Sequence, residues 1–196
     1  MTTGTEVLNA GRGEHVVLFY QDEQELAVQV TEYLLPAVTG GGAAIVVGTP
    51  DHRRSFAEHL AGAGADVAAA RERGSYLELD ASETIRGFMV GDRPDPAGFW
   101  QAASPLLRRA AKAGQPVRVF GEMVSLLWDA GLVNAAIEVE VMWNELGGQH
   151  PFSLLCAYPA RPVACRHYLD ALTEVCRTHT EVTGSPPEPE LADLPD

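Results

Sequence analysis

The sequence predicts an α/β domain in three layers, with a mostly parallel central sheet of about five strands between two layers of helices. Short apolar runs rich in β-branched residues alternate with segments of helical periodicity, as in a series of strand–helix crossovers. These runs lack the polar alternation of half-exposed strands, so we expect helices on both faces of the sheet. The length of 196 residues, of which 46% are hydrophobic and 21% charged, fits one globular domain with a substantial core.

The first strand and helix have the clearest signals. His15–Tyr20 is apolar after its first residue, and Asp22 followed three positions later by Glu25 forms a capping box that starts a helix near Glu23. Pro36 falls near the end of this helix, where it predicts a kink or an early stop.

The later elements follow from similar signals. Thr49 and Pro50 start a second helix, because threonine favours the N-cap and proline the first turn. Asp80 opens a short helix after the third strand. The predicted later strands are 43–47, 76–79, 117–120 and 152–158, and the predicted later helices are 50–61, 80–89, 99–112, 134–146 and 163–178.

The two ends of the chain differ in composition from the middle. Residues 181–196 contain five acidic residues, four prolines and no basic residue, which predicts a disordered acidic tail. Residues 1–13 are predicted to be a flexible N-terminus. The single domain is therefore expected to span residues 14–180.

Charge and composition exclude several classes of function. The net charge of −13 argues against binding to nucleic acid and to anionic membranes, both of which require clustered lysine and arginine. No apolar run approaches the length of a membrane span, and the N-terminal residues lack the apolar core of a signal peptide. Three cysteines give no disulfide framework. We therefore expect a cytoplasmic, reduced protein.

The turn after the first strand argues against a nucleotide-binding loop. It contains neither the glycines that let a backbone approach phosphate nor the lysine that binds it. Asp22 and Glu23 also place negative charge where a helix N-terminus would otherwise attract an anion. The three glycines at 40–42 are better explained as a helix end and a turn.

The predicted helix 134–146 has two polar sectors. Glu140 and Asn144, spaced i, i+4, share one of them, between Trp143 and aliphatic neighbours. The spacing by itself slightly favours a stripe that faces water. Exposing the pair would expose its apolar neighbours too, so we predict that it faces inward, toward Glu122 and the end of the last strand. There it could contact a ligand, bind a hard cation or belong to an internal network.

Several motifs together resemble the MEDS family, the sensory domain of methanogens, methylotrophs and the repressor DcmR. They are FGEMVSLLW, the helix pattern E-x-x-W-N-E-L and PFSLLCAYP, with HVVLFY at 15–20 and CRTH at 176–179. The resemblance runs from about Glu14 to His179. It implies a relative of RecA- and KaiC-like ATPase cores without the phosphate-binding loop, and a sensor of small molecules, with a proposed preference for hydrocarbon derivatives. The family often has a cysteine where this chain has Val17, so no thiol chemistry is carried over.

Four residues near the C-terminus suggest a metal site at first sight: Cys165, His167, Cys176 and His179. Cys165 and Cys176 share a helix face, but they stand about 16 Å apart along the axis and cannot bind the same ion. Cys176 and His179 lie one turn apart and offer half a site, for which a packed pair is the simpler explanation. We expect no metal and no cofactor.

Glu122 is the most conspicuous single residue, since it follows a predicted buried strand at the edge where parallel sheets bind ligands. The resemblance places it where related ATPases carry metal-binding or water-activating acids. A pocket role and a structural role are equally compatible with this position. Tyr20 ends the first strand at the same edge and is favoured for ligand contact over His15, which begins that strand. Cys156 fits either a pocket wall or a buried small hydrophobe.

The leading hypothesis is a non-enzymatic sensory domain that binds a small organic ligand above the C-terminal strand edges and signals by contact with a signalling or transcription-regulating protein. The first alternative is a degenerate RecA-like interaction module without a ligand, and the second is a residual nucleotide-binding enzyme. The sequence leaves ligand, partner and oligomeric state open. The expected pocket residues are Tyr20, Glu122, Trp128, Glu140, Asn144 and Tyr158, with structural or secondary roles for His15, Cys156, Cys176 and His179.

Overall fold

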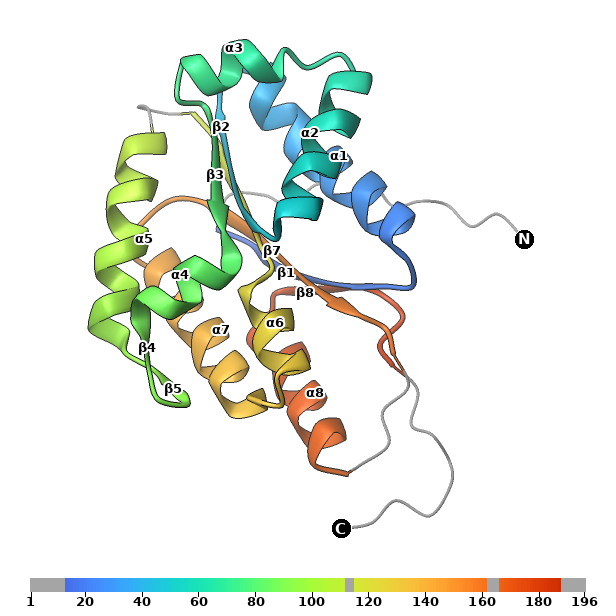
Figure 1. Cartoon of the computed structure of the whole chain (residues 1–196), viewed down its shortest axis with the longest axis vertical. Coiled ribbons are helices and arrows are strands. Elements are labelled where there is room, and N and C mark those ends of the chain that lie inside the picture. Colours follow the sequence, from blue (N-terminus) through green and yellow to red (C-terminus); the bar gives the residue numbers. More distant parts are fainter. Residues whose placement is uncertain (1–12, 112–114, 162–165, 188–196) are drawn as a thin grey trace.

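A six-stranded parallel sheet forms the centre of the computed structural model, which describes residues 13–111, 115–161 and 166–187. The strand order is β3-β2-β6-β7-β1-β8, and every neighbouring pair is parallel (Figure 1). A short antiparallel pair, β4–β5, lies apart from it. The predicted α/β class is confirmed. The strands are β1 (His15–Tyr20), β2 (Ala43–Gly48), β3 (Tyr76–Asp80), β4 (Met89–Val90), β5 (Arg93–Pro94), β6 (Val117–Gly121), β7 (Ser153–Pro159) and β8 (Glu181–Gly184).

Helices cover both faces of the sheet, as the all-apolar strands predict (Figure 1). One face is covered by α1 (Glu23–Thr39), α2 (Pro50–Gly62) and α3 (Val67–Glu72). The other is covered by α4 (Ala81–Phe88), α5 (Pro96–Ala110), α6 (Met123–Asp129), α7 (Val133–Gly147) and α8 (Arg166–Thr178).

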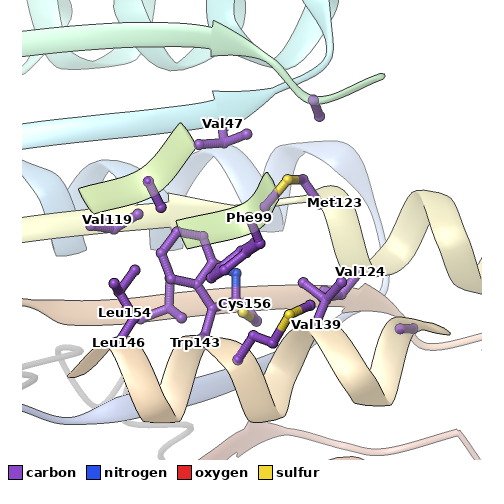
Figure 2. Close-up of a cluster of buried hydrophobic side chains, with 14 of the residues drawn as sticks. Val47, Phe99, Val119, Met123, Val124, Val139, Trp143, Leu146, Leu154 and Cys156 are labelled. Atoms are coloured by element: carbon purple, nitrogen blue, oxygen red, sulfur yellow. The ribbon is translucent and has the colours of Figure 1, made fainter. Parts of the chain in front are cut away.

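The two faces enclose two separate hydrophobic cores, because successive strand residues point to opposite sides. In β1, Val16 and Leu18 pack beneath α1 and α2, whereas Val17 and Phe19 pack on the α7 side. The α7-side core contains Trp143 and Cys156 among its buried side chains (Figure 2). Whether a residue has an odd or an even position along the strand therefore determines the core in which its side chain packs.

Side-chain caps start α1 and α4 where the sequence predicts them. Asp22 accepts a 2.9 Å hydrogen bond from the Glu25 amide, and the Glu25 carboxylate accepts one of 2.7 Å from the amide of Gln21. Asp80 accepts a 3.0 Å hydrogen bond from the Glu83 amide and so ends β3 and starts α4. Helix α1 continues past Pro36 to Thr39, so the early stop predicted there is wrong.

The sixth strand is a correction to the sequence prediction. Glu181–Gly184 was assigned to a disordered tail, but it forms β8 and pairs with β1. Its side chains are mostly exposed at the edge of the sheet, so the strand has no apolar pattern by which to recognise it. The rest of the predicted tail, 188–196, and residues 1–12 of the predicted flexible N-terminus lie outside the described residues.

Within the described part of the chain, no helix has both the length and the apolar character needed to span a membrane.

Candidate functional site

A buried carboxylate, Glu140, lies at the centre of the most polar part of the interior. It projects from α7 toward the sheet, and none of its surface is exposed to solvent. The Tyr158 hydroxyl donates a 2.8 Å hydrogen bond to Oε1, and the Cys156 thiol donates one of 3.2 Å to Oε2. The two donors stand two positions apart on β7 and therefore face the same side of the sheet.

Two histidines complete the shell around this carboxylate. His15 Nε2 lies 3.1 Å from Glu140 Oε2, and His179 Nε2 lies 3.5 Å from Oε1. The two rings contact each other, with centroids 3.9 Å apart. Thr180 places them together, since its amide donates a 2.7 Å hydrogen bond to the His15 carbonyl as the chain enters β8.

The outer nitrogen of each imidazole faces a carbonyl oxygen. The Asn144 amide group donates a 2.7 Å hydrogen bond to the Thr178 carbonyl, so its oxygen faces His15 Nδ1 at 2.9 Å and accepts from it. His179 Nδ1 lies 2.7 Å from the Val175 carbonyl, which also can only accept. The Thr178 hydroxyl, 3.2 Å from the same nitrogen, donates its own hydrogen to Val175. Both rings therefore carry a proton on Nδ1 and turn Nε2 toward Glu140.

The electrostatics leave Glu140 as a buried anion. Burial raises its pKa, but the charges of His179 and His15 and the hydrogen bond from Tyr158 outweigh burial and hold the pKa at about 2. Burial lowers the pKa of His179 by more than the attraction of Glu140 raises it. Burial, followed by the repulsion of Glu140, raises the pKa of Cys156 and of Tyr158 well above their ordinary values. At neutral pH the thiol and the phenol therefore keep their protons.

A cavity of about 250 Å³ lies beside this cluster, at the edge of the sheet where β1 begins. His15 and Asn144 line it, together with the apolar side chains of Trp143, Phe152 and Leu154. Asn144 is exposed, although it bridges His15 and the end of α8. Solvent and small molecules therefore meet the outer side of the cluster here.

Glu122 and Tyr20 belong to a different site, on the face of the sheet covered by α1 and α2. The Glu122 carboxylate accepts a 2.8 Å hydrogen bond from the Thr49 amide and forms a 2.7 Å ion pair with His52, which also pairs with Glu23. These contacts hold the end of β6 to the start of α2.

The predicted Glu140 sector is thus half right. Glu140 faces inward, as predicted, whereas Asn144, the other member of the predicted inward pair, is exposed. The expectation that this sector points toward Glu122 is wrong, because the sheet separates the two carboxylates. Tyr20, at an even position of β1, packs in the core beneath α1 and α2, away from the Glu140 cluster.

The remaining predicted residues lie near the cluster or outside the described side chains. Trp128 packs edge-on against Tyr158, with ring centroids 5.5 Å apart, and so lies behind the hydroxyl that contacts Glu140. Cys176 is a free cysteine packed against the α7-side core, and His179 turns to Glu140. The side chains of Cys165 and His167 are outside the described residues. The sequence did not predict that His15, Cys156 and His179 surround Glu140.

Fold and site together define a three-layer α/β domain that has a buried anionic centre next to a small cavity. The chain belongs to the MEDS family: residues 14–180 match the family described as the MEthanogen/methylotroph, DcmR Sensory domain. No protein of curated function matches the chain.

Among solved structures, the chain is similar to an uncharacterized protein from Pyrococcus horikoshii in complex with an unknown peptide. The TM-score is 0.61, the sequence identity is 12%, and the match covers 90% of this chain and 79% of that one. At this identity the two proteins share the fold.

Proposed function

We propose that this domain is a non-enzymatic sensor that binds a small organic molecule in the cavity beside His15 and passes the signal to another protein by contact. The observation that carries this proposal is that the cavity and the buried Glu140 cluster share a residue, His15. His15 and Asn144 line the cavity, and His15 also contacts the buried Glu140. A ligand in the cavity would therefore act directly on the buried cluster.

The cavity lining supports a ligand with an apolar body and one polar end. Trp143, Phe152 and Leu154 supply apolar surface, and His15 and Asn144 supply hydrogen-bonding groups. The volume of about 250 Å³ limits the ligand to a small molecule. This chemistry agrees with the hydrocarbon derivatives that the family resemblance implies. A second interior space, lined by Phe99 and Met123 among others, measures about 30 Å³, room for one or two water-sized molecules.

The same contacts suggest how a signal would leave the site. Asn144 ties α7 to the end of α8, and Thr180 ties the start of β8 to His15. A ligand that competes for Asn144 or His15 would loosen or tighten both connections. Since β8 is an edge strand, a change in its pairing would reach the surface, where a partner protein can read it.

Two observations favour a sensor, one over an enzyme with a nucleophilic thiol and the other over a docking module without a ligand. The Cys156 thiol is held protonated by burial and by Glu140, which makes it a poor nucleophile. A docking module without a ligand would need a contiguous apolar surface. In the described part of the chain the exposed large hydrophobic residues lie on four separate elements; they are Val28, Val90, Val141 and Val182.

A thermal-shift screen of small alcohols, ketones, carboxylic acids and halogenated alkanes on the purified protein tests the proposal. At least one compound should raise the melting temperature, and Gly147→Leu should abolish that shift. Gly147 lines the cavity, and a Cβ atom there would meet nothing within 4 Å, so a leucine fills space without a clash.

Gly62→Leu is the matched control, since Gly62 also stands at the end of a helix with open space around it, on the opposite face of the sheet. The control should keep the ligand shift. No stabilising compound in the screen, or a shift that survives Gly147→Leu, would contradict a ligand in this cavity.

A further inference from the structure

We propose that His15, Glu140, Cys156 and His179 form a binding site for one divalent transition-metal ion of the zinc class. Each residue offers one ligand atom, and these atoms all lie within 4.8 Å of one another. All four residues are buried. The proposed site shares His15 with the small-molecule cavity. It departs from the expectation of no metal, which rested on the last helix.

The distances among the donor atoms of His15, Glu140 and Cys156 are close to the edges of a tetrahedral metal site. His15 Nε2 lies 3.1 Å from Glu140 Oε2 and 3.4 Å from Cys156 Sγ. Cys156 Sγ lies 3.2 Å from the same oxygen. Tetrahedral bonds of about 2.0–2.1 Å to nitrogen or oxygen and about 2.3 Å to sulfur put neighbouring ligand atoms about 3.3–3.7 Å apart. His179 Nε2 lies 3.5 Å from the other oxygen of Glu140, and all four donor atoms lie within 4.8 Å of one another, so these side chains would have to move closer together to bind one ion.

The imidazole nitrogens give an independent reason to expect a cation. Nδ1 of each ring donates to a carbonyl oxygen, so Nε2 is the ring nitrogen that faces the Glu140 carboxylate. His179 Nε2 is buried and has no hydrogen-bond partner. A divalent cation between these nitrogens and the carboxylate would bond to all three groups.

The surrounding hydrogen bonds have the pattern of an outer coordination shell. Carbonyl oxygens of Asn144 and Val175 fix the two rings with Nε2 inward, and Tyr158 holds one oxygen of Glu140. Outer partners of this kind orient metal-binding histidines and carboxylates in known sites. The cavity beside His15 and Asn144 gives an ion access to the cluster.

Charge balance and ligand type point to zinc or a similar ion. When a divalent ion bonds to Cys156 Sγ, the S–H bond breaks and its proton leaves to solvent. The charges of the ion, one thiolate and one carboxylate then sum to zero. Two imidazoles, a thiolate and a carboxylate suit Zn²⁺ and Co²⁺, whereas Mg²⁺ and Ca²⁺ prefer oxygen ligands.

Titration of the full chain, freed of metal with a chelator, with Co²⁺ alone tests the site. We expect one Co²⁺ per chain, the visible absorption of tetrahedral cobalt and a thiolate-to-cobalt charge-transfer band. Cys156→Ser should remove that band, and Cys176→Ser, the matched thiol control, should keep it. His179→Gln should weaken Co²⁺ binding by about 100-fold or more, whereas His150→Gln should leave it unchanged, because His150 contacts Ser104.

A second variant protects the test against misfolding of these buried substitutions. Asn144 is exposed, so the Asn144→Ala variant should fold. It lacks the hydrogen bond that orients the His15 ring, and it should therefore bind Co²⁺ about 10- to 100-fold more weakly. The proposal is overturned if the folded protein binds no stoichiometric Co²⁺, or if Cys156→Ser and Asn144→Ala bind it as well as the unchanged chain. The thermal-shift screen of organic compounds and the Co²⁺ titration are separate measurements, so the sensor proposal and the metal proposal can fail independently.

Discussion

The Tyr158 hydroxyl donates a 2.8 Å hydrogen bond to the buried carboxylate of Glu140, and this contact joins α7 to β7 inside the domain. Both side chains are at least 98% buried, so neither group has water as a substitute partner. Hydrogen bonds to charged groups contribute more than neutral ones, and a buried acceptor that loses its donor costs the desolvation of that acceptor.

Tyr158→Phe should therefore lower the free energy of unfolding by about 1.5–3 kcal/mol, as measured by urea denaturation of the metal-free protein. Tyr76→Phe is the control. The Tyr76 ring is equally buried, but its hydroxyl has no hydrogen-bond partner, so its removal should be neutral or stabilising. Equal losses in the two variants would mean that the bond to Glu140 adds nothing beyond ring packing.

The His52 site predicts a pH dependence of stability. Burial lowers the pKa of His52, but the carboxylates of Glu122 and Glu23 outweigh it and raise the pKa from 6.5 to about 9. Because the folded-state pKa lies above the unfolded one, the stabilisation is complete below pH 6.5 and is lost as the pH rises to about 9. We expect the free energy of unfolding to fall by about 1–2 kcal/mol over this range, allowing for solvent screening.

Substitutions distinguish the contributions of the Glu122 and Glu23 carboxylates to this pH dependence. Glu122→Gln should remove most of this slope, because Glu122 is only 7% exposed. Glu23→Gln should remove little of it, because Glu23 is 71% exposed and salt screens its pairing. Chemical denaturation at a series of pH values measures the slope for each variant. If Glu23→Gln reduced the pH dependence of the free energy of unfolding more than Glu122→Gln did, the result would contradict the structure.

The link between the sensing cavity and β8 predicts a specific pattern of amide exchange. Asn144→Ala removes the hydrogen bond from Asn144 to the Thr178 carbonyl, next to the residues that lead into β8. Loss of about 1 kcal/mol of local stability should speed the exchange of amides 180–184 by about fivefold, with little effect on β6. Glu145→Ala, at the neighbouring exposed position, is the control and should leave these rates unchanged.

The sequence predicted the inward orientation of Glu140 on α7 because exposing it would also expose its apolar neighbours, Trp143 among them. It also contained the information that separates Glu122 from Glu140. In β6, Val117 and Val119 pack on the α7 side, so the even positions 118, 120 and 122 turn toward α1 and α2. Parity along the strand, applied to Glu122, would have placed it on the face opposite Glu140.

The contact between the His15 and His179 rings could not be predicted in the same way. It depends on the order of the strands, with β1 between β7 and β8, and on the existence of β8. An exposed edge strand of four residues is held by backbone hydrogen bonds and leaves no apolar pattern in the sequence. Without β8, nothing in the sequence brings the end of the last helix back to the start of the first strand.

Gly184 gives a direct test of this edge strand. Its backbone has φ +75°, and a Cβ atom there would lie 2.0 Å from the Phe19 carbonyl oxygen. Gly184→Ala should therefore unpair the end of β8 from β1 and lower the free energy of unfolding by about 1–2 kcal/mol, because both the contact and the dihedral angle exclude a side chain. Gly87→Ala, in α4 with open space at its Cβ, should instead leave stability unchanged or raise it by up to about 1 kcal/mol. Urea denaturation compares the two variants, and amide exchange at residues 181–184 locates the damage. If Gly184→Ala kept the stability of the unchanged chain and the protection of these amides, β8 would not be anchored at Phe19 as the structure shows.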